Sequence, residues 1–227
     1  MKRGTNYIYI IVVSLFLLSC KRESFLEQKP ATNLMTPTTL KDFQQLLDNL
    51  PAMTQVGIPL PQLASDEYTI SYTSWQTLPY AAERNSYIWA SDIYNGEKGE
   101  YDWDRAYISI FYANNVLEGL EKLNESMTTE GLYIKGSALF LRALSFYDLT
   151  RNYCKAYEAS TSSSDLGIPL RLKPGVDYIQ QRSTLQESFD QILSDLENAE
   201  NLLPITRQSD YLNRPSRIAV YALLSRI

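Results

Sequence analysis

The side chains best suited to bind a ligand gather between residues 51 and 100, which hold two tryptophans and five tyrosines but no phenylalanine. A sugar ring presents an apolar face of C–H groups and a rim of hydroxyls. Trp and Tyr suit it because each joins a flat apolar body to a polar group. Trp75, Trp89 and Tyr94 are therefore the predicted ligand-binding residues. The alternative, in which these rings fill a core beneath a long loop, stays open.

Catalytic chemistry finds little support in the sequence. The chain has no histidine, which excludes serine–histidine triads, cysteine–histidine dyads and most zinc sites. Neighbouring acids, Asp66-Glu67 and Asp102/Asp104, could in principle serve a glycosidase. Adjacent acids are ordinary, however, in a chain with 26 acidic residues. We therefore expect a protein that is not an enzyme and that needs no cofactor.

Oxygen ligands for a cation are available near the same segment. Asp92, Asn95, Glu97 and Asp102 could surround such an ion. Their spacing matches no calcium-binding loop, and a solvated acidic turn explains them better. No metal site is predicted.

The N-terminus carries a targeting signal. Lys2 and Arg3 precede an almost uninterrupted apolar run over residues 7–18. A helix of this length rises roughly 18 Å, too little for a bilayer core of roughly 30 Å, so the run indicates a signal peptide over residues 1–19 and not a membrane span. The sequence LLSC at 17–20 then resembles a bacterial lipobox, in which Cys20 carries the lipid as the first residue of the mature protein.

The mature chain is acidic. Without the signal peptide, 19 basic and 26 acidic side chains leave a formal charge of −7. Nucleic acid requires a basic surface, so we expect no nucleic-acid partner. Attachment to the membrane would come from several acyl chains. With Cys20 acylated, Cys154 is the one remaining thiol, so no internal disulfide can form and the fold must rest on its core.

Apolar periodicity predicts an all-α domain over residues 37–227, which a tether over residues 20–36 joins to the lipid anchor. Residues 51–100 and 155–182 are expected to be long irregular loops, because prolines, glycines and polar runs interrupt them. Helices are predicted over residues 37–49, 101–123, 130–152 and 184–203, and from residue 215 onward.

Capping residues support these bounds. Thr36-Pro37 is a helix-start pair, with Thr36 as N-cap and Pro37 at the first helical position. Thr184 and Glu187 form a capping box, and the helix that follows carries the most regular apolar stripe of the chain. The helix over 130–152 is apolar on two sides and should pack between two neighbours.

The two middle helices are joined by a short segment, which predicts an antiparallel hairpin. Trp103 and Tyr107 share the helical register of Ile110 and are predicted to be core residues. Two such hairpins resemble tetratricopeptide-like packing. The chain stops at Ile227 inside the last helical pattern, which predicts a fragment of a longer protein.

Motifs from Cys20 to Ile227 resemble, in order and spacing, the N-terminal part of the SusD/RagB family of outer-membrane nutrient-binding lipoproteins. The most specific is Gly136-x-Ala138-x-Phe140-Leu141-Arg142-Ala143-x3-Tyr147-x-Leu149. The others are Phe25-Leu26-Glu27-Gln28-Lys29-Pro30, Trp103-x3-Tyr107-x2-Ile110-x3-Asn114-Asn115-x-Leu117, Gly167-Ile168-Pro169-Leu170, Ile192-x2-Asp195-Leu196-x2-Ala199-x3-Leu203-Pro204 and Arg217-x-Ala219-x2-Ala222-Leu223-Leu224-x-Arg226.

This resemblance implies a tetratricopeptide-like helical lipoprotein at the outer membrane, facing outward. It implies binding of an oligosaccharide or peptide and delivery, without chemistry, to a SusC-like TonB-dependent barrel transporter. Two alternatives stay open. One is a non-catalytic helical-repeat scaffold of the cell envelope, and the other is an inactive fragment of a SusD-like protein.

Overall fold

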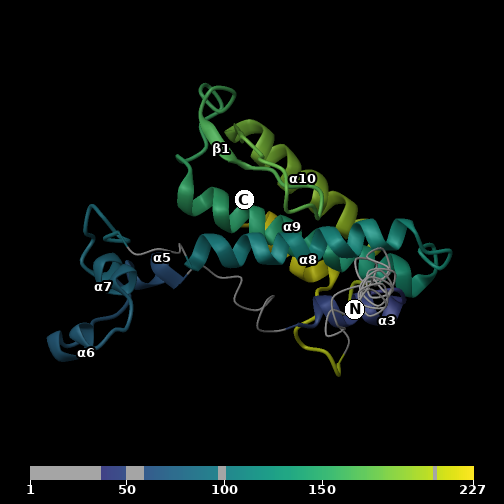
Figure 1. Cartoon of the computed structure of the whole chain (residues 1–227), viewed down its shortest axis with the longest axis horizontal. Helices are drawn as coiled ribbons and strands as arrows, with labels where there is room; N and C mark the ends of the chain where they lie inside the picture. Colours follow the sequence, from purple (N-terminus) through teal and green to yellow (C-terminus); the bar gives the residue numbers. More distant parts are fainter. Residues whose placement is uncertain (1–36, 50–58, 97–100, 207–208) are drawn as a thin grey trace, which may run out of the picture. The chain divides into compact units, whose positions relative to one another are not determined.

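The computed structural model describes residues 37–49, 59–96, 101–206 and 209–227, all within the unit Pro37–Ile227. The predicted signal peptide, the predicted tether, Cys20 and Thr36 lie outside the described residues. In chain order the elements are α3 (Leu40–Leu47), α5 (Pro59–Leu63), α6 (Tyr72–Gln76), α7 (Ala81–Tyr87), α8 (Tyr101–Glu121), α9 (Thr129–Tyr153), β1 (Leu166–Pro169), β2 (Arg182–Thr184), α10 (Leu185–Leu202) and α11 (Arg217–Leu224) (Figure 1).

The helix α9 is the centre of the fold. It packs against α8 on one side and against α10 on the other, as its two apolar faces predict. Ile134 and Ala138 are fully buried with α8, and Phe146 and Leu149 are fully buried on the side of α10. A Cβ atom at Gly136 would lie 2.9 Å from the Cβ of Leu202, so the absence of a side chain there allows the close approach of α9 to the end of α10. The all-α prediction is confirmed.

Caps fix the ends of these helices. Thr128 caps α9 by accepting a hydrogen bond from the Gly131 N–H, and the predicted capping box of Thr184 and Glu187 begins α10. The predicted stripe of α10 is buried, except that Phe189 is half-buried. The last helix begins at Arg217, close to the predicted start.

The first helix begins later than predicted. Pro37 lies before the helix, and Thr39 is the N-cap of α3, with Asp42 completing a capping box. A capping box satisfies backbone N–H groups from two directions, and it therefore sets the start at Leu40 instead of at the proline. Phe43 packs α3 onto α8, where its ring occupies the space that a Cβ atom of Gly119 would need.

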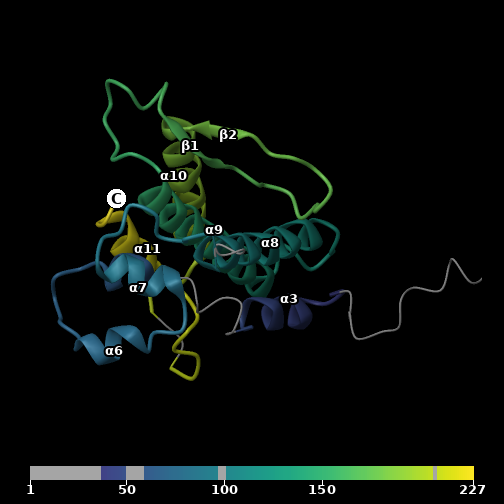
Figure 2. The same ribbon diagram turned by 60° about the vertical axis from the view of Figure 1, so that its left-hand side comes forward.

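Both predicted irregular loops contain regular structure, so these two predictions are wrong in part. Residues 59–87 hold the short helices α5, α6 and α7. The Ser71 side chain caps α6, and Pro59 stands at the first position of α5, where its missing N–H costs nothing. The second loop contains β1 and β2, which pair antiparallel with an irregular register. The segment between the two strands reaches toward α8 (Figure 2).

A buried polar network joins the helices α8, α9 and α10 to the segment between β1 and β2. The Arg142 guanidinium on α9 donates from Nε and Nη2 to the Asp195 carboxylate on α10, at 2.8 and 2.7 Å. Its Nη1 donates to Asn114 Oδ1 on α8 at 2.8 Å, and Asn114 Nδ2 donates in turn to the Arg171 carbonyl at 2.8 Å. The bidentate pairing neutralises a charge that would otherwise be costly to bury.

Candidate functional site

The turn after α7 presents Trp89. The helix ends with two reverse hydrogen bonds: the Trp89 N–H donates to the Ser86 carbonyl at 3.1 Å, and the Ala90 N–H to the Asn85 carbonyl at 2.9 Å. This is a Schellman ending, in which the first residue past the cap takes the left-handed conformation and is usually glycine. Here that residue is Trp89, with φ of 56°.

A tryptophan at this position has a cost. The left-handed conformation costs a residue with a Cβ atom roughly 1–2 kcal/mol, and burial of the side chain does not offset it, since Trp89 is 78% exposed. Residues with backbone strain of this kind cluster at functional sites. The exposure of Trp89 contradicts the core alternative for this residue, and its role as a ligand contact stays a prediction.

The side chains of Asn85 and Asp92 hold the turn that carries Trp89 by hydrogen bonds to its backbone. Asn85 Nδ2 donates to the Asp92 and Ile93 carbonyls, at 3.2 and 2.9 Å. The Asp92 carboxylate accepts from the Asn95 N–H at 2.9 Å. The Asp92 carboxylate thus stabilises the turn itself. Glu97, which was also considered as a cation ligand, lies outside the described residues. The backbone that carries the ring is therefore held in one shape by hydrogen bonds.

The ring of Trp75 has a different setting. It lies on α6, half-buried, and its indole Nε1 donates to the Arg84 carbonyl of α7 at 2.9 Å. Its face stacks on Tyr72, with ring centroids 5.6 Å apart and an interplanar angle of 26°. Tyr72 is 69% exposed. Trp75 therefore supports an exposed tyrosine that is not among the three predicted ligand-binding residues.

Tyr94 points inward. Its hydroxyl shares a 2.8 Å hydrogen bond with that of Tyr153 at the end of α9. Tyr153 meets Trp103 edge-on at 4.9 Å, and Trp103 lies 5.0 Å from Tyr107. The structure thus joins Tyr94 to two rings predicted as core, and it places the three predicted ligand-binding residues in three different settings.

Trp103 and Tyr107 are core residues only in part. They pack against the main core, and each also lines a cavity of about 820 Å³ between α8 and the segment that joins the strands. The Tyr107 hydroxyl donates to the Pro169 carbonyl at 2.8 Å, and burial raises the pKa of Tyr107 well above its usual range. We call this cavity the α8 groove. Its remaining lining is Asp104, Ile108, Phe111, Pro169, Arg171, Val176, Tyr178, Ile179 and Gln180.

The α8 groove was missed because its two walls are far apart in the sequence. One signal was present: Ile108 and Phe111 lie outside the buried stripe of α8 and are exposed apolar residues. Facing them, Val176 and Ile179 are exposed as well. Apolar side chains on both walls of a groove mark a surface suited to binding.

The acids of the two neighbouring pairs differ in their exposure to solvent. Asp66 and Glu67 are both exposed, whereas Asp102 is buried and Asp104 exposed. Burial raises the pKa of Asp102 to about 6, and the nearby Glu83 carboxylate adds to the rise, while a hydrogen bond with the Leu60 backbone opposes it.

Within residues 37–49, 59–96, 101–206 and 209–227, no group of three or more His, Cys, Asp or Glu side chains is placed to hold a metal ion. Among the same residues, no helix has the length and apolar character that a bilayer crossing requires.

The fold defines a helical-repeat protein of the tetratricopeptide-like class. More narrowly, the chain belongs to the SusD-like family, because residues 24–227 match the family model described as starch-binding and associating with the outer membrane. A SusD-like protein of Formosa agariphila is 34% identical over 113 residues, which cover 48% of this chain and 19% of that protein.

Solved structures share the fold. A SusD superfamily protein from Bacteroides fragilis matches with a TM-score of 0.68 and 24% identity, covering 85% of this chain and 46% of the other. A SusD-like carbohydrate-binding protein from Bacteroides vulgatus matches with a TM-score of 0.59 and 17% identity, covering 84% and 41%. This chain therefore spans less than half the length of these relatives.

Proposed function

We propose that this chain captures an oligosaccharide at the outer membrane and delivers it, without catalysis, to a SusC-like TonB-dependent transporter. The observation that carries the proposal is Trp89, an exposed aromatic ring held in a backbone position that favours glycine. An indole face stacks on the C–H face of a sugar, and a pre-shaped turn keeps it ready to do so.

The wider surroundings support a sugar more than a peptide. Exposed Tyr72, stacked on Trp75, adds a second ring with a polar hydroxyl. The family model is described as starch-binding, and one structural relative is named as carbohydrate-binding. Flat rings with polar handles match a ligand whose faces are apolar and whose rim is hydroxylated.

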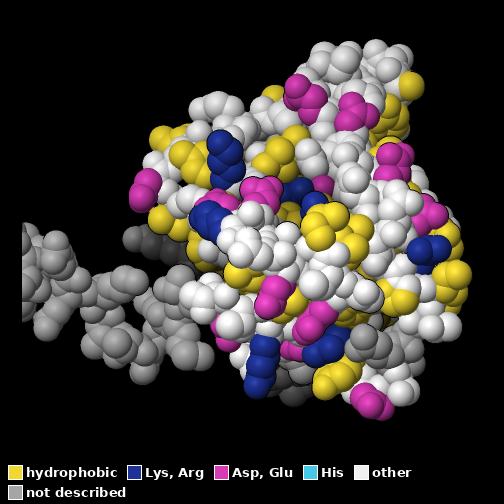
Figure 3. All heavy atoms as spheres, turned by 90° about the vertical axis from the view of Figure 1, so that its right-hand side faces the viewer, with side chains coloured by type: hydrophobic (Ala, Val, Ile, Leu, Met, Phe, Trp, Pro, Cys, Tyr) yellow, Lys and Arg dark blue, Asp and Glu magenta, His cyan; other side chains and the backbone are white. Residues whose placement is uncertain are grey.

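Membrane attachment would come from Cys20 and its acyl chains, since several chains hold a protein firmly where one does not. On the face shown in Figure 3, Lys and Arg side chains lie among acidic and apolar ones instead of in one basic patch. A mixed face of this kind does not provide the basic surface that nucleic acid or anionic headgroups require. The outward orientation and the transporter partner are inferred from membership of the SusD-like family.

Titration of the full chain in detergent against a panel of neutral oligosaccharides tests the proposal. Trp89→Ala should weaken binding about five- to a hundred-fold, because a stacking contact is worth roughly 1–3 kcal/mol by analogy with bases on aromatics. Met127→Ala is the matched control, since Met127 is 77% exposed against 78% for Trp89. Affinities that are the same in both variants and in the parent would contradict the proposal.

The scaffold alternative is favoured by one observation, the α8 groove. Val176 and Ile179 offer no polar group to a sugar, and exposed aliphatic side chains suit a protein contact better. A pure scaffold would bind no member of the oligosaccharide panel, whereas a capture protein with a second partner surface would bind at least one.

A further inference from the structure

Residues 59–96, which we call the α5–α7 segment, contact the start of α8 through Leu60. The Leu60 N–H of α5 donates to the Asp102 carboxylate of α8. The Leu60 carbonyl accepts from Ser86 Oγ of α7 at 3.2 Å, and the Leu60 side chain is buried. Within the segment, α5 packs on α7. The Asp102 carboxylate is therefore one of the groups that join this segment to the long helices.

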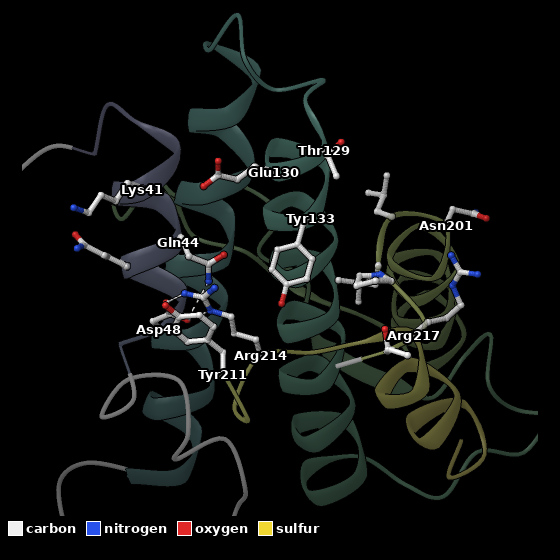
Figure 4. A pocket seen from close by; sticks show the side chains of 15 residues that line it. Lys41, Gln44, Asp48, Thr129, Glu130, Tyr133, Asn201, Tyr211, Arg214 and Arg217 are labelled. Atoms are coloured by element: carbon white, nitrogen blue, oxygen red, sulfur yellow. Dashed lines mark hydrogen bonds and ion pairs between the residues drawn. The ribbon is translucent and has the colours of Figure 1, made fainter. Parts of the chain in front are cut away.

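Asp102 differs from two other carboxylates of this fold, which are each paired with an arginine. In the wall of a large cavity (Figure 4), the Arg214 guanidinium donates to both oxygens of Asp48, at 3.0 and 2.6 Å. Asp195 accepts in the same way from Arg142, at 2.8 and 2.7 Å. The Oδ2 atom of Asp102, by contrast, is buried and has no hydrogen-bond partner among the described residues.

A second carboxyl oxygen without a donor lies on α7. Glu83 Oε2 is also buried and has no hydrogen-bond partner in the part of the chain that the structure describes. The Glu83 charge acts on Asp102 and disfavours its ionisation, whereas Arg105, further along α8, favours it. A buried carboxylate oxygen without a donor costs free energy. A proton on Asp102 removes this cost, and it needs no room beside the atom.

These surroundings give the contact a defined dependence on pH. Burial raises the pKa of Asp102 from 3.8 to about 6; the Leu60 N–H and the Arg105 guanidinium oppose the rise, and the Glu83 carboxylate adds to it. A carboxyl group whose pKa is raised by a contact stabilises that contact fully below its ordinary pKa, and this contribution is lost as the pH rises through the higher value. The contact of the α5–α7 segment with α8 should therefore weaken between about pH 4 and about pH 6.

We propose that the α5–α7 segment is a pH-sensitive unit, which is docked on α8 while Asp102 is protonated and opens more often once Asp102 is ionised. Trp89 and Tyr72 lie on this segment. The proton on Asp102 therefore decides how firmly these two exposed rings are held against the long helices. The docking itself does not depend on the proposed glycan capture, because it concerns contacts of the protein without a ligand.

Hydrogen exchange of the full chain in detergent, measured by mass spectrometry and corrected for the intrinsic effect of pH on exchange, tests the proposal. The amides of α5 and α7 should lose protection about fifty-fold between about pH 4 and about pH 7, most of it below about pH 6. Asp102→Asn keeps an oxygen for the Leu60 N–H but cannot ionise, so its protection should not change with pH. Asp104→Asn is the matched control, because it removes an exposed acid from the same turn of α8 and should behave as the parent does.

Equal protection of the segment at both ends of this pH range in the parent would overturn the proposal, and so would an Asp102→Asn variant that keeps the parent's pH dependence. Glu83→Gln decides the question if Asp102→Asn does not fold. It removes the negative charge that raises the pKa of Asp102, so the loss of protection should be smaller and complete at a lower pH; an unchanged curve would contradict the proposal. Exchange is measured without sugar, so failure here is distinguishable from failure of the proposed glycan capture.

Discussion

Replacing Trp89 by glycine should stabilise the protein while it weakens the binding of sugar. The substitution relieves a left-handed residue with φ of 56°, which is worth roughly 1–2 kcal/mol. The extra freedom of glycine in the unfolded chain takes back roughly 0.5–1 kcal/mol. The net gain lies between about 0 and 1.5 kcal/mol, or between about 0 and 6 °C in Tm for a domain of this size. A tryptophan that filled the core would instead lose roughly 3–5 kcal/mol.

Thermal melts and titrations of three variants separate these effects. Trp89→Ala loses the ring but keeps a Cβ atom in the strained position, so Trp89→Gly should melt above Trp89→Ala, and both should bind oligosaccharide equally weakly. Ala82→Gly is the control, because a glycine inside the regular helix α7 should lower the stability by roughly 0.5–1 kcal/mol instead of raising it. A Trp89→Gly variant that melts below Trp89→Ala would refute the strain argument, and parent-like affinity would refute the role in binding.

Four further changes test the rest of the molecule. Asp102 has a folded pKa of about 6 against 3.8 as its ordinary value, so its contribution to stability is complete below about pH 4 and is lost as the pH rises to about 6. Asp102→Asn should therefore raise the free energy of unfolding at pH 7 by on the order of 1–2 kcal/mol. Urea titrations should also show that the free energy of unfolding of this variant depends less on pH between about 4 and 6 than that of the parent, and an unchanged dependence would contradict this. Arg142→Met should cost roughly 3–5 kcal/mol by leaving a buried carboxylate unpaired, and urea melts should show that adding Asp195→Leu restores part of the loss. Ala138→Arg places a charge at a residue with no exposed surface and should cost several kcal/mol in a thermal melt, roughly 3–5; an unchanged midpoint would mean that this face is solvated. Cys20→Ala should abolish palmitate labelling and move the protein out of the membrane fraction, and labelling that survives would end the lipoprotein interpretation.

The long helices could be predicted from the sequence because their signals are local. The capping box of Thr184 and Glu187 and the stripe behind it define α10 without reference to any other segment. The helices α5 to α7 escaped prediction because five to seven residues are too few to show a periodic face. The strands β1 and β2, of four and three residues, are also too short to show an alternating pattern, and β1 includes Pro169.

The candidate site was predictable in composition but not in geometry. An aromatic-rich segment is visible in the sequence, yet the exposure of Trp89 depends on how α7 ends. The inward position of Tyr94 depends on Tyr153, 59 residues further along the chain. Likewise the pairing of Arg142 with Asp195 spans 53 residues. Contacts at such separations follow from packing and not from local propensity.

The segment that forms one wall of the α8 groove is attached to the helices through its main chain. Tyr107 and Asn114 on α8 donate to the Pro169 and Arg171 carbonyls, and Ser183 on the neighbouring strand β2 donates to the Ile168 carbonyl. Main-chain carbonyls are the same in every residue type, so these anchors do not depend on which side chains the segment carries. Residues 172–181 can therefore be exchanged by loop grafting without loss of these three anchors. The inner path of the segment depends in addition on Arg171, which donates to the Gly175 and Tyr178 carbonyls and lies over the Tyr178 ring. The helices would then act as a constant frame on which new surface specificities evolve.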